Sequence, residues 1–249
     1  MRESQPQQRS IDLVRIAGID VAVDLSWVVI FLLVLWSLSA GYFPQAYPGQ
    51  PWFTYLVGGL AATLLFFVSV LVHEFSHALV ANRLGEHVRR ITLFIFGGMA
   101  HLTSEPRSPA AEFKIAVVGP LTSLALGGLF WGLSRLVGAG APLWGEVFHY
   151  LGFINVALAI FNLLPGFPLD GGRLLRAYFW SRSGDLRDAT GRAADWGGGI
   201  AIGLMMLGAI EIFSGALVGG LWLSGACWCW RTGGCSVSSR ARASPASCR

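Results

Sequence analysis

The chain has 249 residues, of which 54% are hydrophobic and only 13% are charged. A soluble domain carries roughly 25% charged residues, so this composition excludes an ordinary soluble protein and indicates several membrane spans. The formal net charge of +4 comes from scattered arginines rather than from one basic face, which gives no case for nucleic-acid binding.

The first 23 residues are predicted to form a cytoplasmic N-terminal segment. Residues 1–8 are polar and precede a mixed segment without a small-residue cleavage site, so we expect no cleavable signal peptide. Residues 11–24 are rich in isoleucine and valine, which predicts a strand.

Apolar runs near the roughly 20 residues that cross a bilayer occur six times. The sequence therefore predicts an all-α polytopic membrane protein with about six transmembrane helices and short interfacial β-strands. With the N-terminus in the cytoplasm, every basic residue except Arg135 falls on the cytoplasmic side, which predicts that both termini are cytoplasmic. The predicted spans are residues 24–41, 54–82, 113–137, 147–166, 196–213 and 214–231.

The second predicted span contains His73-Glu74-Phe75-Ser76-His77 within an apolar run. On a helix, residues four apart are separated by about 6 Å and about 40°, so both imidazoles can reach one ion. The glutamate between them lies close enough to activate a water molecule. Ionisable residues in hydrocarbon cost several kcal/mol unless they serve a buried, wetted site. The motif therefore predicts metal-assisted hydrolysis within the bilayer.

Residues 88–102, between the second and third spans, do not have a helical pattern. They are rich in β-branched and aromatic residues and are interrupted by Gly97-Gly98, which predicts two short strands with a turn or bulge. Together with residues 11–24 they predict a small sheet at the cytoplasmic interface. An open edge of this sheet could hold an extended peptide through main-chain hydrogen bonds.

A catalytic zinc ion usually has three protein ligands, and Asp170 is the best candidate for the third. Pro165, Gly166 and Pro168 precede it, so the fourth span must break there. Broken backbone within a membrane is tolerated where it lines a wet cavity. Asp170 could instead only cap a helical segment over residues 171–180. We favour the ligand interpretation because the histidine motif lacks its third ligand.

The two motifs together resemble the site-2 protease family of intramembrane zinc metalloproteases, peptidase family M50. The histidine motif of residues 73–77 and Leu169-Asp170-Gly171 carry the resemblance, which extends from about residue 15 to residue 223. The supporting features are Gly97-Gly98, Gly119-Pro120 and Asn162-Leu163-Leu164-Pro165.

The resemblance implies one Zn²⁺ per chain, held by His73, His77 and Asp170, with Glu74 as catalytic base and acid. Asn162 would also be catalytic, by positioning the substrate or stabilising the oxyanion, although it could instead hydrogen-bond the broken backbone. The strand with Gly97 and Gly98 would bind the unwound substrate.

The predicted activity is hydrolysis of peptide bonds within or next to transmembrane segments, as in regulated intramembrane proteolysis. The family suggests single-span membrane-protein substrates in a prokaryotic cell membrane, with anti-sigma factors and signal-peptide remnants as candidates. A metal transporter and a non-proteolytic scaffold that binds membrane clients are the alternatives. Transporters need ligands along a crossing route, and the intact Glu74 disfavours a scaffold.

Polar residues outside these motifs are predicted to have ordinary roles. Glu105 and Glu112 flank Pro106 and Pro109 and are expected to be solvated charges in a cytoplasmic loop. Ser69 lies in the second span, where a serine is common.

Residues 24–223 are predicted to form the protease domain, and residues 224–249 the end of the last helix and a disordered or aberrant tail. The tail shows no pattern of regulatory CBS modules, and its sequence leaves open whether it is native, truncated or frameshifted. Its cysteines fit no structural zinc pattern. They are Cys227, Cys229, Cys235 and Cys248.

Overall fold

The computed structural model describes residues 10–94, 97–102 and 106–213. The chain divides into two compact units. The first comprises Met1–Glu105 and Leu121–Ala159, and the second comprises Pro106–Pro120 and Ile160–Arg249. Each unit is described separately below.

The predicted helical membrane fold is confirmed for the described residues. Four helical segments are long and apolar enough to cross a membrane, namely Ser26–Ala46, Trp52–Arg83, Pro109–Val137 and Pro142–Asn162. They match the first four predicted spans. The fifth predicted span lies within the helix α7 (Leu186–Phe213), whereas the sixth, together with all four cysteines, lies outside the described residues.

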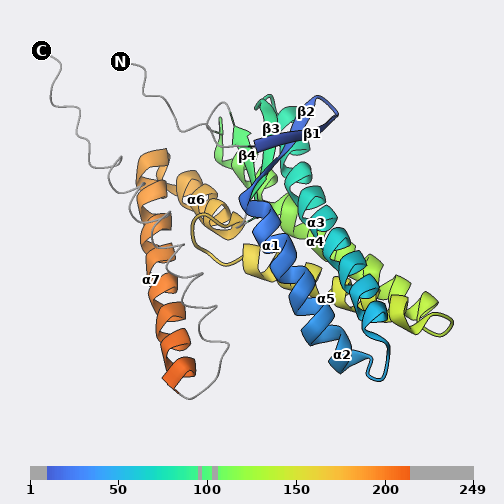
Figure 1. Ribbon diagram of the computed structural model, residues 1–249. Helices are drawn as coiled ribbons and strands as arrows, with labels where there is room; N and C mark the ends of the chain where they lie inside the picture. Colours follow the sequence, from blue (N-terminus) through green and yellow to red (C-terminus); the bar gives the residue numbers. More distant parts are fainter. Residues whose placement is uncertain (1–9, 95–96, 103–105, 214–249) are drawn as a thin grey trace, which may run out of the picture. The chain divides into compact units, whose positions relative to one another are not determined.

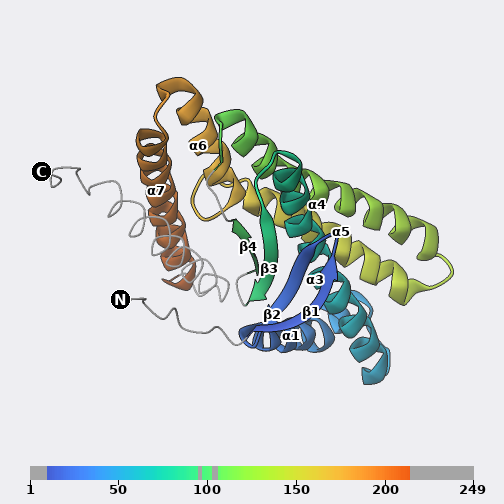
Figure 2. The ribbon, with the colours of Figure 1, turned by 90° about the horizontal axis from the view of Figure 1, so that it is seen from above.

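A four-stranded sheet in the first unit confirms the predicted strands (Figures 1 and 2). Strands β1 (Ser10–Ile16) and β2 (Ile19–Asp24) pair antiparallel, and β2 pairs parallel with β3 (Val88–Phe94). Strand β4 (Gly97–Leu102) pairs antiparallel with β3 and is the last strand in the sheet order. The predicted glycine pair therefore begins β4.

The single strand expected over residues 11–24 is a hairpin. Ala17 and Gly18 connect β1 to β2 with φ values of 48° and 81°, as expected of a two-residue turn whose twist matches that of the paired strands. Ile19, Val21 and Ile91 are buried in the two central strands. Burial of these β-branched side chains explains why the segments form strands.

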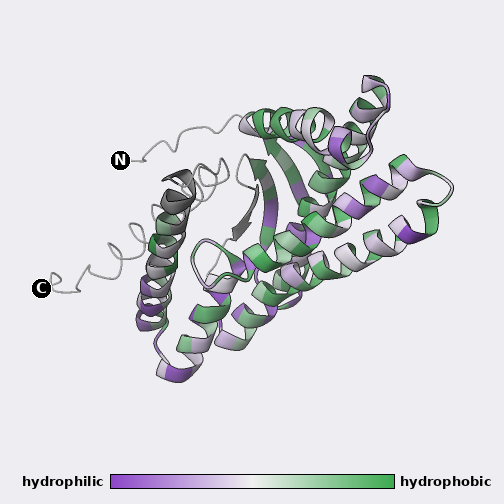
Figure 3. Cartoon of the chain, turned by 90° about the horizontal axis from the view of Figure 1, so that it is seen from below, coloured by the Kyte–Doolittle hydropathy of each residue, from purple (hydrophilic) through white to green (hydrophobic). Residues whose placement is uncertain are grey.

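The helices of the first unit begin with α1 (Ser26–Trp36), the π-helical turn η1 (Ser37–Tyr42) and α2 (Phe43–Ala46). Helix α3 (Trp52–Arg83) follows. Helix α1 is largely hydrophobic in Figure 3, and half of its apolar side chains are exposed and none is buried. Exposed apolar surface on a span-length segment fits a lipid environment.

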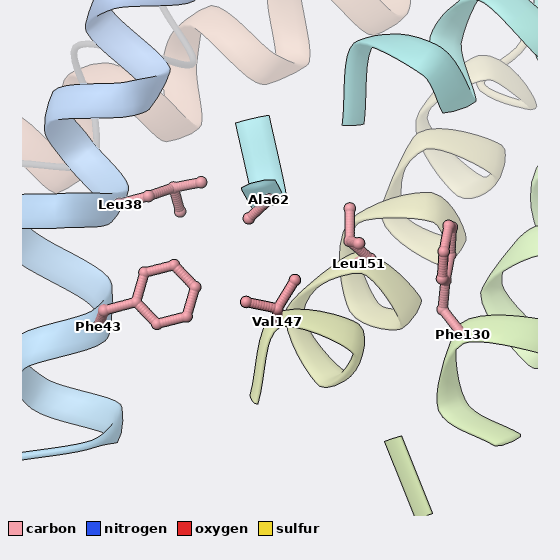
Figure 4. Close-up of a cluster of buried hydrophobic side chains, with 6 residues drawn as sticks. All are labelled: Leu38, Phe43, Ala62, Phe130, Val147 and Leu151. Carbon is pink, nitrogen blue, oxygen red and sulfur yellow. The ribbon is translucent and has the colours of Figure 1, made fainter. Parts of the chain in front are cut away.

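Buried apolar side chains form the core of the first unit (Figure 4). Helices α4 (Pro109–Val137) and α5 (Pro142–Asn162) are divided between the two units, and the segments that belong to the first unit contribute to this core. The Phe43 ring points toward Val147 in Figure 4. The cluster consists of Leu38, Phe43, Ala62, Phe130, Val147 and Leu151.

The second unit contains α6 (Asp170–Ser183) and α7, which pack against each other (Figure 1). Helix α5 ends at Asn162, so the predicted break before Pro165 is confirmed. The connecting loop packs tightly, because a Cβ atom on Gly166 would lie 3.1 Å from the Cα atom of Gly197. Gly184, with φ of 73°, ends α6 in the left-handed conformation favoured by glycine.

Candidate metal centre and active site

Helix α3 places the two histidines of the motif on one face, because they are separated by four residues. His73 and His77 are 2% and 5% exposed. Their Nε2 atoms lie 3.2 Å apart, and the ring planes are inclined at 79°. The Nε2 atoms of the two imidazoles therefore face the same point inside the first unit.

This separation fits two ligands of one zinc ion. Zinc binds imidazole nitrogen at about 2.0–2.1 Å in tetrahedral geometry, which puts two such nitrogens about 3.3 Å apart. The observed 3.2 Å agrees with that value. Both residues also lie on one regular helix, so the spacing of their backbone positions does not depend on a loop.

The Nδ1 atom of His73 has a hydrogen-bond partner that the sequence analysis did not single out. This atom lies 2.9 Å from the Ser123 hydroxyl, and Ser123 is fully buried. Ser123 belongs to α4, 50 positions further along the chain. No local signal in the sequence marked it, since isolated serines are common in apolar helices.

Glu74 follows His73 directly on α3 and is half-buried. Partial exposure spares this carboxylate the cost of fully burying a charge. Ser76 donates a hydrogen bond from its hydroxyl to the His73 carbonyl oxygen at 2.6 Å. Ser76 therefore contacts the backbone of the motif rather than its rings.

Asp170 is the first residue of α6, and its side chain is buried. Leu169, rather than Asp170, occupies the N-cap position, with extended backbone. A carboxylate in the first turn is still favoured by the helix dipole. Two imidazoles and one carboxylate form a donor set compatible with zinc, and all three residues are buried.

The remaining predicted site residues lie in two different elements. Asn162 is the last residue of α5 and is half-buried, directly before the break in the chain. Gly97 and Gly98 begin β4, opposite Phe94 and Leu93 of β3. The glycine pair thus lies in the last strand of the sheet, as an element that receives an extended peptide would.

Glu112 corrects the sequence interpretation of the loop before the third span. It is fully buried in the first turn of α4 and forms an ion pair with Arg176 of α6. The Arg176 Nε atom lies 2.7 Å from a carboxylate oxygen of Glu112. The prediction of a solvated charge was wrong because nothing in the local sequence reveals a cation 64 positions away.

The chain belongs to peptidase family M50. The model of this family matches residues 61–141 and 139–206, which include both predicted motifs. The resemblance inferred from the histidine and aspartate motifs is thereby confirmed.

Individual relatives agree with this assignment. Rip3 of Mycobacterium tuberculosis is 44% identical over 221 residues, covering 88% of this chain and 56% of the relative. Zinc metalloprotease MJ0392 of Methanocaldococcus jannaschii is 31% identical, covering 82% of this chain and 55% of the relative. The chain therefore spans about half the length of the curated relatives it matches.

A solved structure also has the same fold. The Site-2 Protease from Methanocaldococcus jannaschii matches with a TM-score of 0.61 and 26% sequence identity. The match covers 96% of this chain and 99% of that protein.

Proposed function

We propose that this chain is an intramembrane zinc metalloendopeptidase, which hydrolyses peptide bonds within or next to transmembrane segments of membrane proteins. The observation that carries the proposal is the pair of buried imidazole nitrogens 3.2 Å apart on α3. This helix is 32 residues long and apolar enough to cross a membrane. Ionisable side chains within a membrane-spanning helix are costly unless they serve a functional site.

The proposed metal site consists of His73, His77 and Asp170 around one zinc ion. Its support is the donor set, the burial of all three residues and the separation of the two imidazole nitrogens. When bound, zinc activates a water molecule and polarises the scissile carbonyl. The two imidazoles would each contribute a nitrogen ligand, and Asp170 would contribute a carboxylate oxygen.

Glu74 is the proposed general base and general acid. Its carboxylate accepts a proton from the attacking water as the oxygen bonds to the scissile carbonyl carbon. When the bond from that carbon to the amide nitrogen breaks, Glu74 returns the proton to the departing amine. Its place beside His73 on one helix supports this role.

Substrate binding is proposed at the edge of β4. A transmembrane helix hides its amide groups in hydrogen bonds, so it must unwind before attack, and an extended segment can then pair with an edge strand. Gly97 and Gly98 carry no side chains and would let the substrate backbone approach closely. The amide of Asn162 is proposed to orient the substrate or donate a hydrogen bond to the oxyanion.

The proposed setting is a prokaryotic cell membrane, with both termini and the active-site end of α3 toward the cytoplasm. The support is the distribution of basic residues, since only Arg135 falls on the outer side. The proposed substrates are single-span membrane proteins. Anti-sigma factors and signal-peptide remnants are candidates, as regulated intramembrane proteolysis would require.

The proposal is tested by incubating the purified full chain in lipid vesicles with a tagged single-span substrate. We expect cleavage inside the span, its loss with a zinc chelator and its recovery with added zinc. A paired substrate with glycines around the scissile bond should be cleaved faster because it unwinds more easily. Cleavage that persists after complete zinc removal would refute the metalloprotease assignment.

A further inference from the structure

The Ser123 hydroxyl touches the nitrogen of His73 that points away from His77. The two atoms lie 2.9 Å apart, and the two residues are 0% and 2% exposed. This hydrogen bond joins α4 to α3 within the first unit. Water is excluded from it, so the hydroxyl replaces solvent as the partner of the ring.

The two nitrogens of a neutral imidazole have opposite roles, since one carries the proton and the other carries the lone pair. The Nε2 atom of His73 faces Nε2 of His77 at 3.2 Å, so Nε2 is the nitrogen that can bind the shared ion. The proton must then be on Nδ1, where Ser123 is placed to accept it. A buried N–H group without an acceptor would cost about 1–3 kcal/mol.

We propose that Ser123 is a positioning residue that holds His73 in its metal-binding tautomer and fixes the ring orientation. This inference rests on the proposed zinc function. The hydroxyl accepts the hydrogen bond from Nδ1–H, and this directs the lone pair of Nε2 toward the point shared with His77. Partners of this kind on the far nitrogen of a ligand histidine typically change metal affinity by about 10–100-fold.

The substitution Ser123→Ala removes the acceptor and leaves the Nδ1–H group buried. His73 can then avoid the cost by moving its proton to Nε2, which removes the ligand lone pair, or by turning its ring. Both responses weaken metal binding. Ser123→Thr keeps the hydroxyl and should restore most of the affinity.

Ser69 offers a matched control on the same helix as His73. It is 2% exposed, and its hydroxyl donates to the Leu65 carbonyl oxygen at 2.9 Å. It also accepts a hydrogen bond from the Asn155 amide at 3.3 Å. Ser69→Ala therefore deletes a buried hydroxyl by the same chemical change without touching an imidazole.

The experiment measures cobalt and zinc affinity of the purified full chain by competition with a coloured chelator, with the Co²⁺ absorption spectrum as a report on ligand geometry. We expect Ser123→Ala to lose about 10–100-fold in affinity and to show an altered Co²⁺ spectrum, whereas Ser69→Ala retains both. Unchanged affinity and spectrum in a folded Ser123→Ala protein would overturn the inference. Failure of the wild-type chain to bind either metal would instead overturn the proposed function.

A second measurement needs no variant and covers the case in which Ser123→Ala does not fold. In the zinc-loaded wild-type chain with ¹⁵N-labelled histidine, the ring nitrogen shifts identify which atom of His73 carries the proton. We expect the proton on Nδ1. A proton on Nε2, or a deprotonated Nδ1 atom in the metal-loaded protein, would contradict the role given to Ser123.

Discussion

The carboxylate of Glu112 and the guanidinium of Arg176 form a buried ion pair that fastens the first turn of α4 to α6. The Arg176 side chain is 17% exposed, and Glu112 is fully buried. The same guanidinium lies 5.5 Å from the centre of the Phe167 ring, in the loop that leads to Asp170. One side chain thus holds together the helix that carries Asp170, the loop before it and the start of the third predicted span.

Loss of this ion pair should destabilise the protein strongly. Arg176→Ala leaves a buried carboxylate without its cation, so we expect a loss of about 3–5 kcal/mol in the free energy of unfolding. The matched control is Arg192→Ala, because Arg192 pairs with Asp188 on the surface of α7 and exposed pairs contribute at most about 1 kcal/mol. Denaturant or thermal unfolding in detergent would measure both. Equal effects of the two substitutions would contradict the structural role of Arg176.

Glu74→Gln separates a protease from a metal-binding protein of another class. The amide cannot carry a proton from water to the leaving amine, so cleavage should fall by about 10²–10⁴-fold. Zinc content should stay at that of the wild type, because Glu74 is not a proposed ligand. Glu146→Gln is the control, since its carboxylate accepts a hydrogen bond from Tyr42 at 2.6 Å and has no catalytic role. Undiminished cleavage by the Glu74→Gln protein would contradict the role of Glu74 as general base.

Asp170→Ala tests the third ligand. Loss of a ligand should lower zinc binding below one ion per chain, as measured by metal analysis after dialysis. Asp188→Ala removes the acidic residue from the first turn of α7 and serves as the control for the helix-dipole contribution, which is about 0.3–1 kcal/mol. If both variants retain zinc and lose only this small stability, Asp170 is not a ligand.

Gly171→Ala should disturb the loop that places Asp170. A Cβ atom at this position would overlap the carbonyl oxygens of Leu163 and Leu164. Such crowding against backbone costs about 1–3 kcal/mol. Gly191→Ala on α7 meets no atom within 4 Å and should be neutral or stabilise the helix by up to about 1 kcal/mol. Comparison of unfolding and zinc content in the two variants checks the prediction, which fails if they behave alike.

Asp24 should make the stability of the N-terminal end of α1 depend on pH. Hydrogen bonds from the Ser26 hydroxyl and from its backbone N–H hold the pKa of Asp24 below its ordinary value of 3.8. Because the folded pKa is lower than the unfolded one, the stabilisation is complete above about pH 4 and is lost as pH falls through the folded pKa. The difference in melting temperature between wild type and Asp24→Ala should therefore shrink below pH 4. A constant difference down to pH 2 would contradict this.

The histidine motif and the helix break before Asp170 could be predicted from the sequence, because both depend on residues that are close together in the chain. The four-residue interval between His73 and His77 places two imidazoles on one helix face, and the closely spaced Pro165, Gly166 and Pro168 predict the end of a helix. The β-branched residues of β2 and β3 likewise predicted strands. Even so, the Ala17-Gly18 turn was missed, because alanine at positive φ has no reliable signature in sequence.

Long-range contacts were decided only by the tertiary structure. Ser123 was not singled out, and Glu112 was predicted to be an ordinary solvated acid. Their partners, His73 and Arg176, are 50 and 64 positions away. Sequence periodicity reports which face of an element is apolar, whereas the pairing of buried polar groups depends on which helices pack together. The sequence thus determined the proposed metal-binding residues and the helical membrane class, whereas the tertiary structure decided which buried polar side chains lie next to one another.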